Sequence, residues 1–560
     1  MLEAAGQFRP WAKGPTRYQL GETLLKKELE RTKTRMKIYE DEWKTNGCSI
    51  MTDGWTDTKK RTILNLCVNS KSGTVFLSSK ESSDESHTGD HIYQYVEGCI
   101  QQVGLENIVQ VVTDNDTNNM AAAKILKTKR PTIFWTSCAA HSINLALEGI
   151  GNLQGYKETL VSARKITVFI YAHHKSLALM RKYTMKRDIV RPGVPRFASA
   201  FLTLQSLLEK GVQLRQMFMS AQWEACNHSK KKKGKEVCQL AIANKTWGVT
   251  RCLSVFEPLV KVLRMVDADW KPSMGFLYGE LKRAKQQIKD ALKNNNELYS
   301  DIMNIIYAKT DGRLDSCLHL AAYILNPYSY YNDSSIQHDG RANDAVVEVI
   351  ETLYPDDIEL QLRIVNDELP IYKEKQGKFS WVIAIKGCEV NNDRYDPASW
   401  WSNYGGEIPN LRIAAMRLLS LTTSSSGCER NWSTFEAIHT KKRNRLEANK
   451  VNNLVYIQFN GNLINKNSKR KERLSRDTLL SNESTTEAQD WILDEGLTYD
   501  FNGDATRVSR TSTRELFEDF ESKSEEEEEE VDDELEYEPD GVEILERNYV
   551  HDDDFIFAEE

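Results

Sequence analysis

Two aspartates stand where short β-branched segments end. Asp53 follows Ile50-Met-Thr, and Asp114 follows Val109-Gln-Val-Val-Thr. If the two segments are neighbouring parallel strands, both carboxylates emerge at one sheet edge, where oxygen ligands suit a pair of Mg²⁺ or Mn²⁺ ions. Such a site normally needs a third carboxylate. The alternative interpretation is that Asp53-Gly and Asp114-Asn are turn formers that end strands.

The segments around these aspartates predict the elements that must position them. Short β-branched runs indicate strands, and patterns with helical period indicate helices between them. The predicted strands are 49–53, 62–69, 74–79, 108–113 and 132–136, and the predicted helices are 91–103, 120–129 and 139–149. The order βββαβαβα predicts an α/β fold with a mixed sheet that starts antiparallel and adds parallel strands. This is the ribonuclease H-like order.

The rest of the chain divides by composition. We expect an N-terminal extension and helix, the first part of the sheet core, a largely helical stretch, a compact aromatic block, and a disordered acidic tail. Within the helical stretch, polar residues predict loops at 227–235 and 326–339. The expected boundaries are 1–45, 46–154, 155–390, 391–462 and 463–560.

Charge is distributed unevenly along the 560 residues. Residues 481–560 contain 30 Asp and Glu against 5 Lys and Arg, a net charge of −25, so residues 1–480 carry +17 of the total of −8. A basic body points to a polyanion, and DNA is the first partner to consider. No run approaches the roughly 18 apolar residues of a membrane span, and the ten cysteines form no C-x-x-C pair, which favours a reducing compartment.

Several motifs together closely resemble transposase-derived proteins of the hAT superfamily. The resemblance covers roughly residues 10–460 and is strongest in the C-terminal half. The motifs are Asp53-Gly-Trp-Thr-Asp, Val111-Val-Thr-Asp-Asn, Trp135-Thr-Ser-Cys-Ala-Ala-His141, Arg191-Pro-Gly-Val-Pro-Arg-Phe-Ala, Asp396-Pro-Ala-Ser-Trp-Trp, Ser424-Ser-Ser-Gly-Cys-Glu-Arg-Asn-Trp and Ile438-His-Thr-Lys-Lys-Arg-Asn-Arg.

The resemblance implies a ribonuclease H-like core with an Asp/Asp/Glu triad on Asp53, Asp114 and Glu429, which would be both the catalytic residues and the metal ligands. Residues 155–390 would then be a large helical insertion before Glu429, and 391–462 a dimerisation segment that completes the core. Asp116 stands where the family usually has a small residue. The alternative for Glu429 is a capping box, Ser426-Gly-Cys-Glu429, at a helix start.

The same resemblance implies a set of DNA contacts. His141 lies in the family's Cys-x-x-His motif near the DNA ends, and Arg196-Phe197 aligns with an Arg-Trp motif whose aromatic ring stacks on a displaced base. Cys138 and His141 lack a second ligand pair, so no zinc is expected. Basic clusters at 230–235, 469–473 and in the run formed by Lys441, Lys442, Arg443 and Arg445 are either phosphate contacts, nuclear-import signals or ordinary solvated charge.

Large apolar residues dominate the C-terminal block. Large apolar residues at helical spacing usually form the core, yet the family uses this segment to associate. We therefore expect these residues to complete the fold and also to contact a second chain, which would be another copy of this protein or a related hAT-like protein. The candidate dimerisation residues are Trp400, Trp401, Leu411, Leu418 and Trp432.

We therefore expect a nuclear protein that dimerises and associates with DNA and has no membrane segment. Complete hAT transposases usually begin with a zinc finger, whereas the first cysteine here is Cys48, so we expect a domesticated or truncated copy, or a missing upstream segment. The rival hypotheses are an active cut-and-paste transposase that uses Mg²⁺ or Mn²⁺, and a protein-interaction scaffold without DNA contact.

Overall fold

A computed structural model describes most of the chain to Glu472. The described residues are 14–56, 61–83, 88–191, 198–242, 246–268, 271–292, 296–392, 395–438, 446–472, 498–499 and 505–506, and all lie in one compact unit, Met1–Val508. Six predicted DNA contacts and most of the predicted acidic tail lie outside these residues. The six are Arg196, Phe197, Lys441, Lys442, Arg443 and Arg445.

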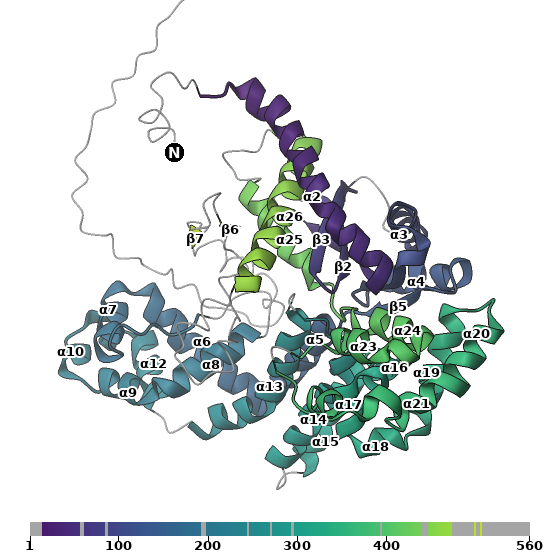
Figure 1. The fold of residues 1–560 in the computed structure, drawn as a ribbon. Helices are drawn as coiled ribbons and strands as arrows, with labels where there is room; N and C mark the ends of the chain where they lie inside the picture. The colour runs from purple at the N-terminus through teal and green to yellow at the C-terminus, as the bar shows by residue number, and fades with distance from the viewer. Residues whose placement is uncertain are drawn as a thin grey trace, which may run out of the picture. The chain divides into compact units, whose positions relative to one another are not determined.

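A five-stranded mixed sheet forms the centre of the N-terminal region (Figure 1). Its order is β3-β2-β1-β4-β5, with β1, β2 and β3 antiparallel and with β4 and β5 added in parallel. The prediction of an antiparallel start with parallel additions is confirmed. The strands are β1 (Cys48–Thr56), β2 (Thr62–Ser70), β3 (Gly73–Glu81), β4 (Ile108–Thr113) and β5 (Phe134–Ser137).

Alternate residues of the central strands enter two separate apolar clusters, as the twofold period of a strand requires. Ile50 and Val111 belong to a cluster with helices α2 (Leu25–Asn46), α3 (Gly89–Val103) and α4 (Thr117–Lys129). Met51 and Val112 point to the other face and join a cluster with α5 (Ala139–Gly151) and α25 (Ser426–Ile438). Both faces of the sheet are therefore covered.

Between Gln154 and Lys386, every described element is a helix. The first half shares the apolar cluster of Met51 and Val112, so it continues the core of the sheet. The helices are α6 (Gln154–Ala172), α7 (His174–Tyr183), α8 (Ala198–Glu209), α9 (Gly211–Phe218), α10 (Ala221–Glu224), α11 (Asn227–Lys230), α12 (Lys232–Ile242), α13 (Thr246–Asp267), α14 (Met274–Ala291), α15 (Asn296–Thr310), α16 (Cys317–Leu325), α17 (Pro327–Asn332), α18 (Ser334–Gln337), α19 (Gly340–Leu353), α20 (Ile358–Leu362), η3 (Arg363–Glu368), α21 (Leu369–Lys373), η4 (Gly377–Ser380) and α22 (Val382–Lys386).

A third apolar cluster joins the second half of these helices to the C-terminal block. It contains Val109 of β4 and residues from Met274 to Leu421, and it has Trp401 among its fully buried side chains. The core therefore crosses the boundary expected at residue 390. The C-terminal helices are α23 (Pro397–Tyr404), η5 (Gly405–Glu407), α24 (Pro409–Leu419), α25 and α26 (Ala448–Glu472).

Helices from the two ends of the described chain lie side by side. The N-terminal α2 runs along α26 in Figure 1, and the two helices contact each other. Asn460 of α26 accepts a hydrogen bond from the Phe76 backbone N–H of β3 and donates one to its carbonyl, at 3.0 and 2.9 Å. Because β3 is an edge strand, these bonds satisfy backbone groups that would otherwise be unpaired. The remaining elements are η1 (Gln19–Leu24), η2 (Leu105–Asn107), β6 (Thr498–Tyr499) and β7 (Ala505–Thr506).

The two predicted loops are wrong. Residues 227–235 contain α11 and the start of α12, and 326–339 contain α17 and α18. The helices α11, α17 and α18 are one or two turns long, and the Asp333 carboxylate caps α18 by accepting a hydrogen bond from the Ser335 N–H. Polar residues in such short helices cannot be told from loop residues by pattern. The helix α26 also shows that residues 463–472, expected in the tail, are helical.

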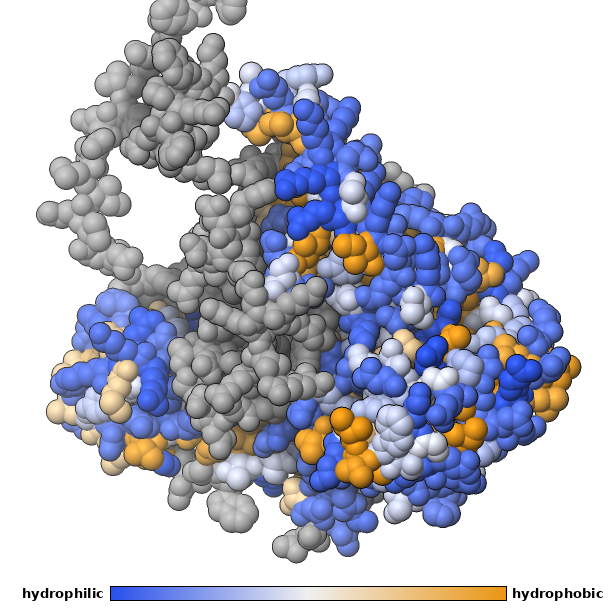
Figure 2. All heavy atoms as spheres, in the orientation of Figure 1, coloured by the Kyte–Doolittle hydropathy of each residue, from blue (hydrophilic) through white to orange (hydrophobic). Residues whose placement is uncertain are grey.

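On the face shown in Figure 2, hydrophilic residues dominate and hydrophobic residues gather in a few separate patches. Among the described residues, no helix is both long enough and apolar enough to cross a membrane.

Candidate functional site

The strand register brings Asp53 and Asp114 to neighbouring positions. Met51 of β1 pairs in parallel with Val112 of β4, so two residues further along each strand Asp53 stands opposite Asp114. Neighbouring strands lie about 4.8 Å apart. Both aspartates have the same parity as Met51 and Val112, and therefore face α25. The predicted convergence of the two aspartates is observed.

The loop after β4 holds the Asp114 carboxylate in place. Its Oδ1 accepts hydrogen bonds from the Asp116 N–H at 3.1 Å and from Asn119 Nδ2 at 2.5 Å. Asp116 is exposed and caps α4, where it accepts from the Asn118 N–H at 3.2 Å. The unusual aspartate at this position therefore has a local role as a helix cap.

Glu429 reaches this edge through a buried stretch of polar chain, residues 420–428, which we name the return segment. All of it is buried, although six of its residues are Ser or Thr. Burying hydroxyl and amide groups is costly unless they are hydrogen-bonded. Here Gln110 of β4 donates to the Thr422 carbonyl at 2.6 Å, and the Ala139 N–H of α5 donates to the Thr423 carbonyl at 2.8 Å.

Further contacts fix the return segment against β1, β3 and α14. The Ser273 and Thr423 hydroxyls are 2.7 Å apart, and the Ser425 N–H donates to Cys138 Sγ at 3.3 Å. At Gly427, an added Cβ would lie 2.8 Å from Thr74 and 2.9 Å from Met51, which is closer than real side chains approach. Position 427 must therefore be glycine for the segment to lie this close to the sheet.

The helix α25 begins directly on the return segment and carries Glu429 in its first turn. The N–H of Ser426, which the capping-box interpretation assigns to Glu429, donates to the Ser424 hydroxyl at 3.1 Å. This N–H therefore has an acceptor already. Glu429 is partly buried, as are Asp53 and Asp114.

Electrostatics show that the three carboxylates lie near one another. Burial raises the pKa of Asp53 well above its usual value, and the negative charges of Glu429 and then Asp114 raise it further, against a hydrogen bond from the Gly54 N–H. Like charges that crowd together disfavour the ionised form. A bound cation would relieve this repulsion.

The donor set suits a hard divalent cation, because all three groups offer carboxylate oxygens. The described residues nevertheless form no group of three or more His, Cys, Asp or Glu side chains close enough to hold a metal ion together in their present positions. The carboxylates are therefore gathered at one edge without forming a closed ligand shell.

His141 and Cys138 lie at the start of α5 but differ in environment. The His141 side chain is exposed. Cys138 is buried, and its sulfur accepts from the return segment, so it stabilises the approach of Glu429 instead of facing outward. The exposed His141 is free to meet a molecule that approaches the sheet edge.

Most of the candidate dimerisation residues lie inside the chain. Trp400, Trp401, Leu411 and Leu418 are buried, and the two indole N–H groups donate to the carbonyls of Ala384 and Leu325 at 2.8 and 2.7 Å. Their contacts build the core of the C-terminal block, and this arrangement leaves them little surface for a second chain. Trp432 is partly buried.

Exposed apolar residues lie just before this block in the chain, and sequence reasoning missed them. Trp381, Val382, Ile383 and Val390 are 53%, 70%, 67% and 61% exposed, and we name them the α22 patch. Consecutive apolar residues resemble core, so the sequence gives no direct signal. Their exposure follows from the orientation of α22, whose Ala384 is the residue buried against Trp400.

Two family models match the chain. The model described as domain of unknown function DUF659 matches residues 15–166, which include Asp53 and Asp114. The model described as hAT family C-terminal dimerisation region matches residues 373–460, which include Glu429 and the α22 patch. No curated protein matches the chain. DUF659 occurs in hAT-type transposase-like proteins, so the two matches together identify a hAT-family, transposase-derived protein that dimerises.

Replacing one crowded carboxylate should stabilise the fold. We expect Asp53→Asn to raise the free energy of unfolding at pH 7 by roughly 0.5–2 kcal/mol, because the amide keeps the acceptor for the Gly54 N–H and removes a partly buried negative charge. Chemical denaturation in the presence of a chelator measures this. Asp116→Asn is the matched control and should have no effect, since Asn also caps helices well. A destabilised Asp53→Asn protein would show that the carboxylates do not repel one another.

Proposed function

We propose that this hAT-derived protein acts in the nucleus as a DNA-associated dimer with a ribonuclease H-like core. The sheet order β3-β2-β1-β4-β5, antiparallel first and then parallel, supports the core assignment. The convergence of Asp53, Asp114 and Glu429 at the carboxyl end of β1 and β4 is the observation that carries the proposal. Residues brought together from two distant parts of the chain point to a site that works on a ligand.

The charge of the body favours DNA as that ligand. Residues 1–480 carry +17, and a body of this charge attracts phosphate backbones by releasing their counterions. The exposed His141 stands at the start of α5, which follows β5 at the same sheet edge. The five lysines Lys230–Lys233 and Lys235 are also exposed, and they are candidates for phosphate contacts or for nuclear import.

A second candidate function, DNA strand cleavage and transfer, is favoured by the retention of all three carboxylates. With Mg²⁺ or Mn²⁺ bound, Asp53, Asp114 and Glu429 would hold the ions, which activate the attacking oxygen and stabilise the leaving oxygen of a phosphodiester. The chain's own contribution is to fix Asp114 through Asp116 and Asn119, and Glu429 through the return segment.

For self-association, the α22 patch is the surface we propose. Four large apolar side chains exposed within ten residues make a patch of the kind that marks interaction sites, and the patch lies inside the matched dimerisation region. The buried Trp400 orients this patch, because its indole N–H donates to the Ala384 carbonyl and so holds α22 with its apolar side chains outward.

The double substitution Val382→Ser and Ile383→Ser should shift the protein from dimer towards the monomer mass of 64.3 kDa. In a symmetric dimer each change counts twice, so we expect the dissociation constant to rise about 10- to 100-fold. Light scattering after size exclusion, over a dilution series, measures this. Ile358→Ser is the control, since Ile358 is equally exposed at 67% but lies outside the matched region. An unchanged dimer would place the interface elsewhere.

Duplex DNA binding should weaken steeply with salt. From about 50 to 200 mM salt we expect a loss of about tenfold in affinity for every two phosphates contacted, as measured by fluorescence anisotropy with labelled duplexes of several sequences. His141→Ala should weaken binding by about three- to tenfold. His174→Ala, which removes another exposed histidine on α7, should not. Absence of binding at low salt would favour the scaffold hypothesis and overturn the DNA proposal.

A further inference from the structure

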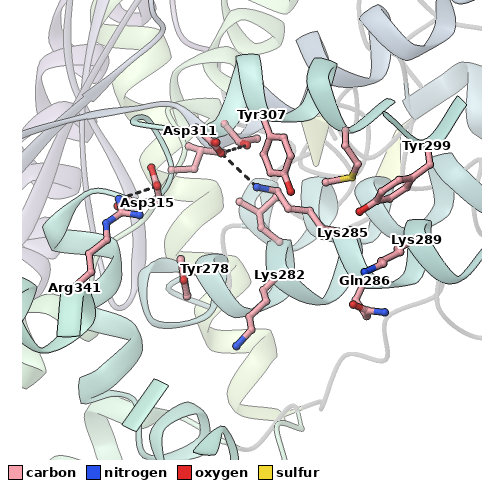
Figure 3. A pocket seen from close by; sticks show the side chains of 14 residues that line it. Tyr278, Lys282, Lys285, Gln286, Lys289, Tyr299, Tyr307, Asp311, Asp315 and Arg341 are labelled. Atoms are coloured by element: carbon pink, nitrogen blue, oxygen red, sulfur yellow. Dashed lines mark hydrogen bonds and ion pairs between the residues drawn. The ribbon is translucent and has the colours of Figure 1, made fainter. Parts of the chain in front are cut away.

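Two helices of the helical stretch, together with the loop that follows the second of them, form a groove far along the chain from the carboxylates. It lies between α14 and α15 and is closed at one end by the start of α19 (Figure 3). Its volume is about 410 Å³, within the range of pockets that hold small ligands. Leu281, Met303 and Leu314 supply apolar side chains to its lining. We name it the lysine–tyrosine groove after the residues described next.

The helix α14 contributes three lysines to the groove beside Tyr278, and α15 contributes two tyrosines. On α14, Lys282, Lys285 and Lys289 follow one another at helical spacing, so they share one face. On α15, Tyr299 and Tyr307 are eight residues apart and also share a face. A row of ammonium groups therefore stands across from a row of aromatic rings.

Some of the basic side chains in the groove are held in position by ion pairs within the chain. Lys285 Nζ lies 4.5 Å from the centre of the Tyr307 ring and 3.5 Å from Asp311 Oδ1, and Arg341 contacts Asp315 at 2.8 Å; Figure 3 shows both ion pairs. Lys289 is exposed, and within the described residues it makes no ion pair. Lys282 also contacts Asp333 at 2.9 Å, so three of the four cations that line the groove are ion-paired and Lys289 carries the remaining positive charge.

We propose that the lysine–tyrosine groove binds a segment of single-stranded nucleic acid, with lysines on the phosphates and tyrosine rings stacked on the bases. Base stacking on aromatic side chains together with a basic track is the usual mode of single-strand binding. A duplex hides the faces of its bases and cannot offer them to Tyr299 and Tyr307. This inference rests on the proposed DNA association and adds a second, strand-selective site to it.

The test uses the full chain, a fluorescein-labelled twelve-residue thymidine oligonucleotide and fluorescence anisotropy. The double variant Lys289→Ala and Tyr299→Ser should weaken oligonucleotide binding about 10- to 100-fold, and duplex binding should stay within about twofold of the unaltered protein. Lys289→Glu changes only an exposed side chain, so it separates loss of binding from misfolding, and it should weaken oligonucleotide binding about tenfold. The matched control, Lys26→Ala with Tyr18→Ser, removes an exposed Lys and Tyr of the N-terminal helices.

The outcomes separate this inference from the proposed function. Unchanged oligonucleotide affinity in both groove variants would overturn the groove assignment and leave DNA association intact. If the control pair weakens oligonucleotide binding equally, the groove assignment is also overturned, because the loss would then come from the lower net charge of the protein and not from the groove. An unaltered protein that binds duplex but no oligonucleotide would also overturn it, whereas one that binds neither would overturn the proposed function itself.

Discussion

The site depends on the buried hydrogen bonds of the return segment. Six Ser and Thr residues in 420–428 would destabilise the interior if they lacked partners. The sheet supplies some of those partners, through Gln110 and the start of α5, and α14 supplies another through Ser273. Because these bonds are local and directional, they determine where α25 begins, and thereby where Glu429 lies relative to Asp53 and Asp114.

This arrangement explains how a long helical stretch between α5 and the return segment is compatible with three carboxylates at one sheet edge. The helical stretch shares one apolar cluster with the sheet face of Met51 and Val112, and another with the C-terminal block around Trp401. The chain therefore leaves the sheet after α5 and returns to it through a continuous core. Gly427 lies against Met51 of β1 and Thr74 of β3, and a side chain there would push α25 away from the sheet.

The sequence predicted the sheet well because its signals are local. Alternation and β-branching indicate the five strands. The convergence of Asp53 and Asp114 was conditional on a parallel pairing of their strands, and β1 and β4 meet that condition. Glu429 was placed by resemblance alone, since no pattern connects it with β1. The candidate dimerisation residues show what sequence reasoning could not predict. Trp400 and Leu411 are large and apolar, but composition does not tell which apolar residues face inward. The α22 patch is decided by tertiary packing of Ala384 against Trp400.

The most direct test of the assembled carboxylates is calorimetric titration of the full chain with Mn²⁺. The triple variant Asp53→Asn, Asp114→Asn and Glu429→Gln provides the background, which includes the acidic tail. We expect close to two ions per chain above that background, and we expect Asp114→Asn and Glu429→Gln each to weaken binding at least tenfold. Asp116→Asn should leave it unchanged. If Glu429→Gln binds Mn²⁺ as tightly as the unaltered protein, the return segment does not bring Glu429 into the site, and the central claim is wrong.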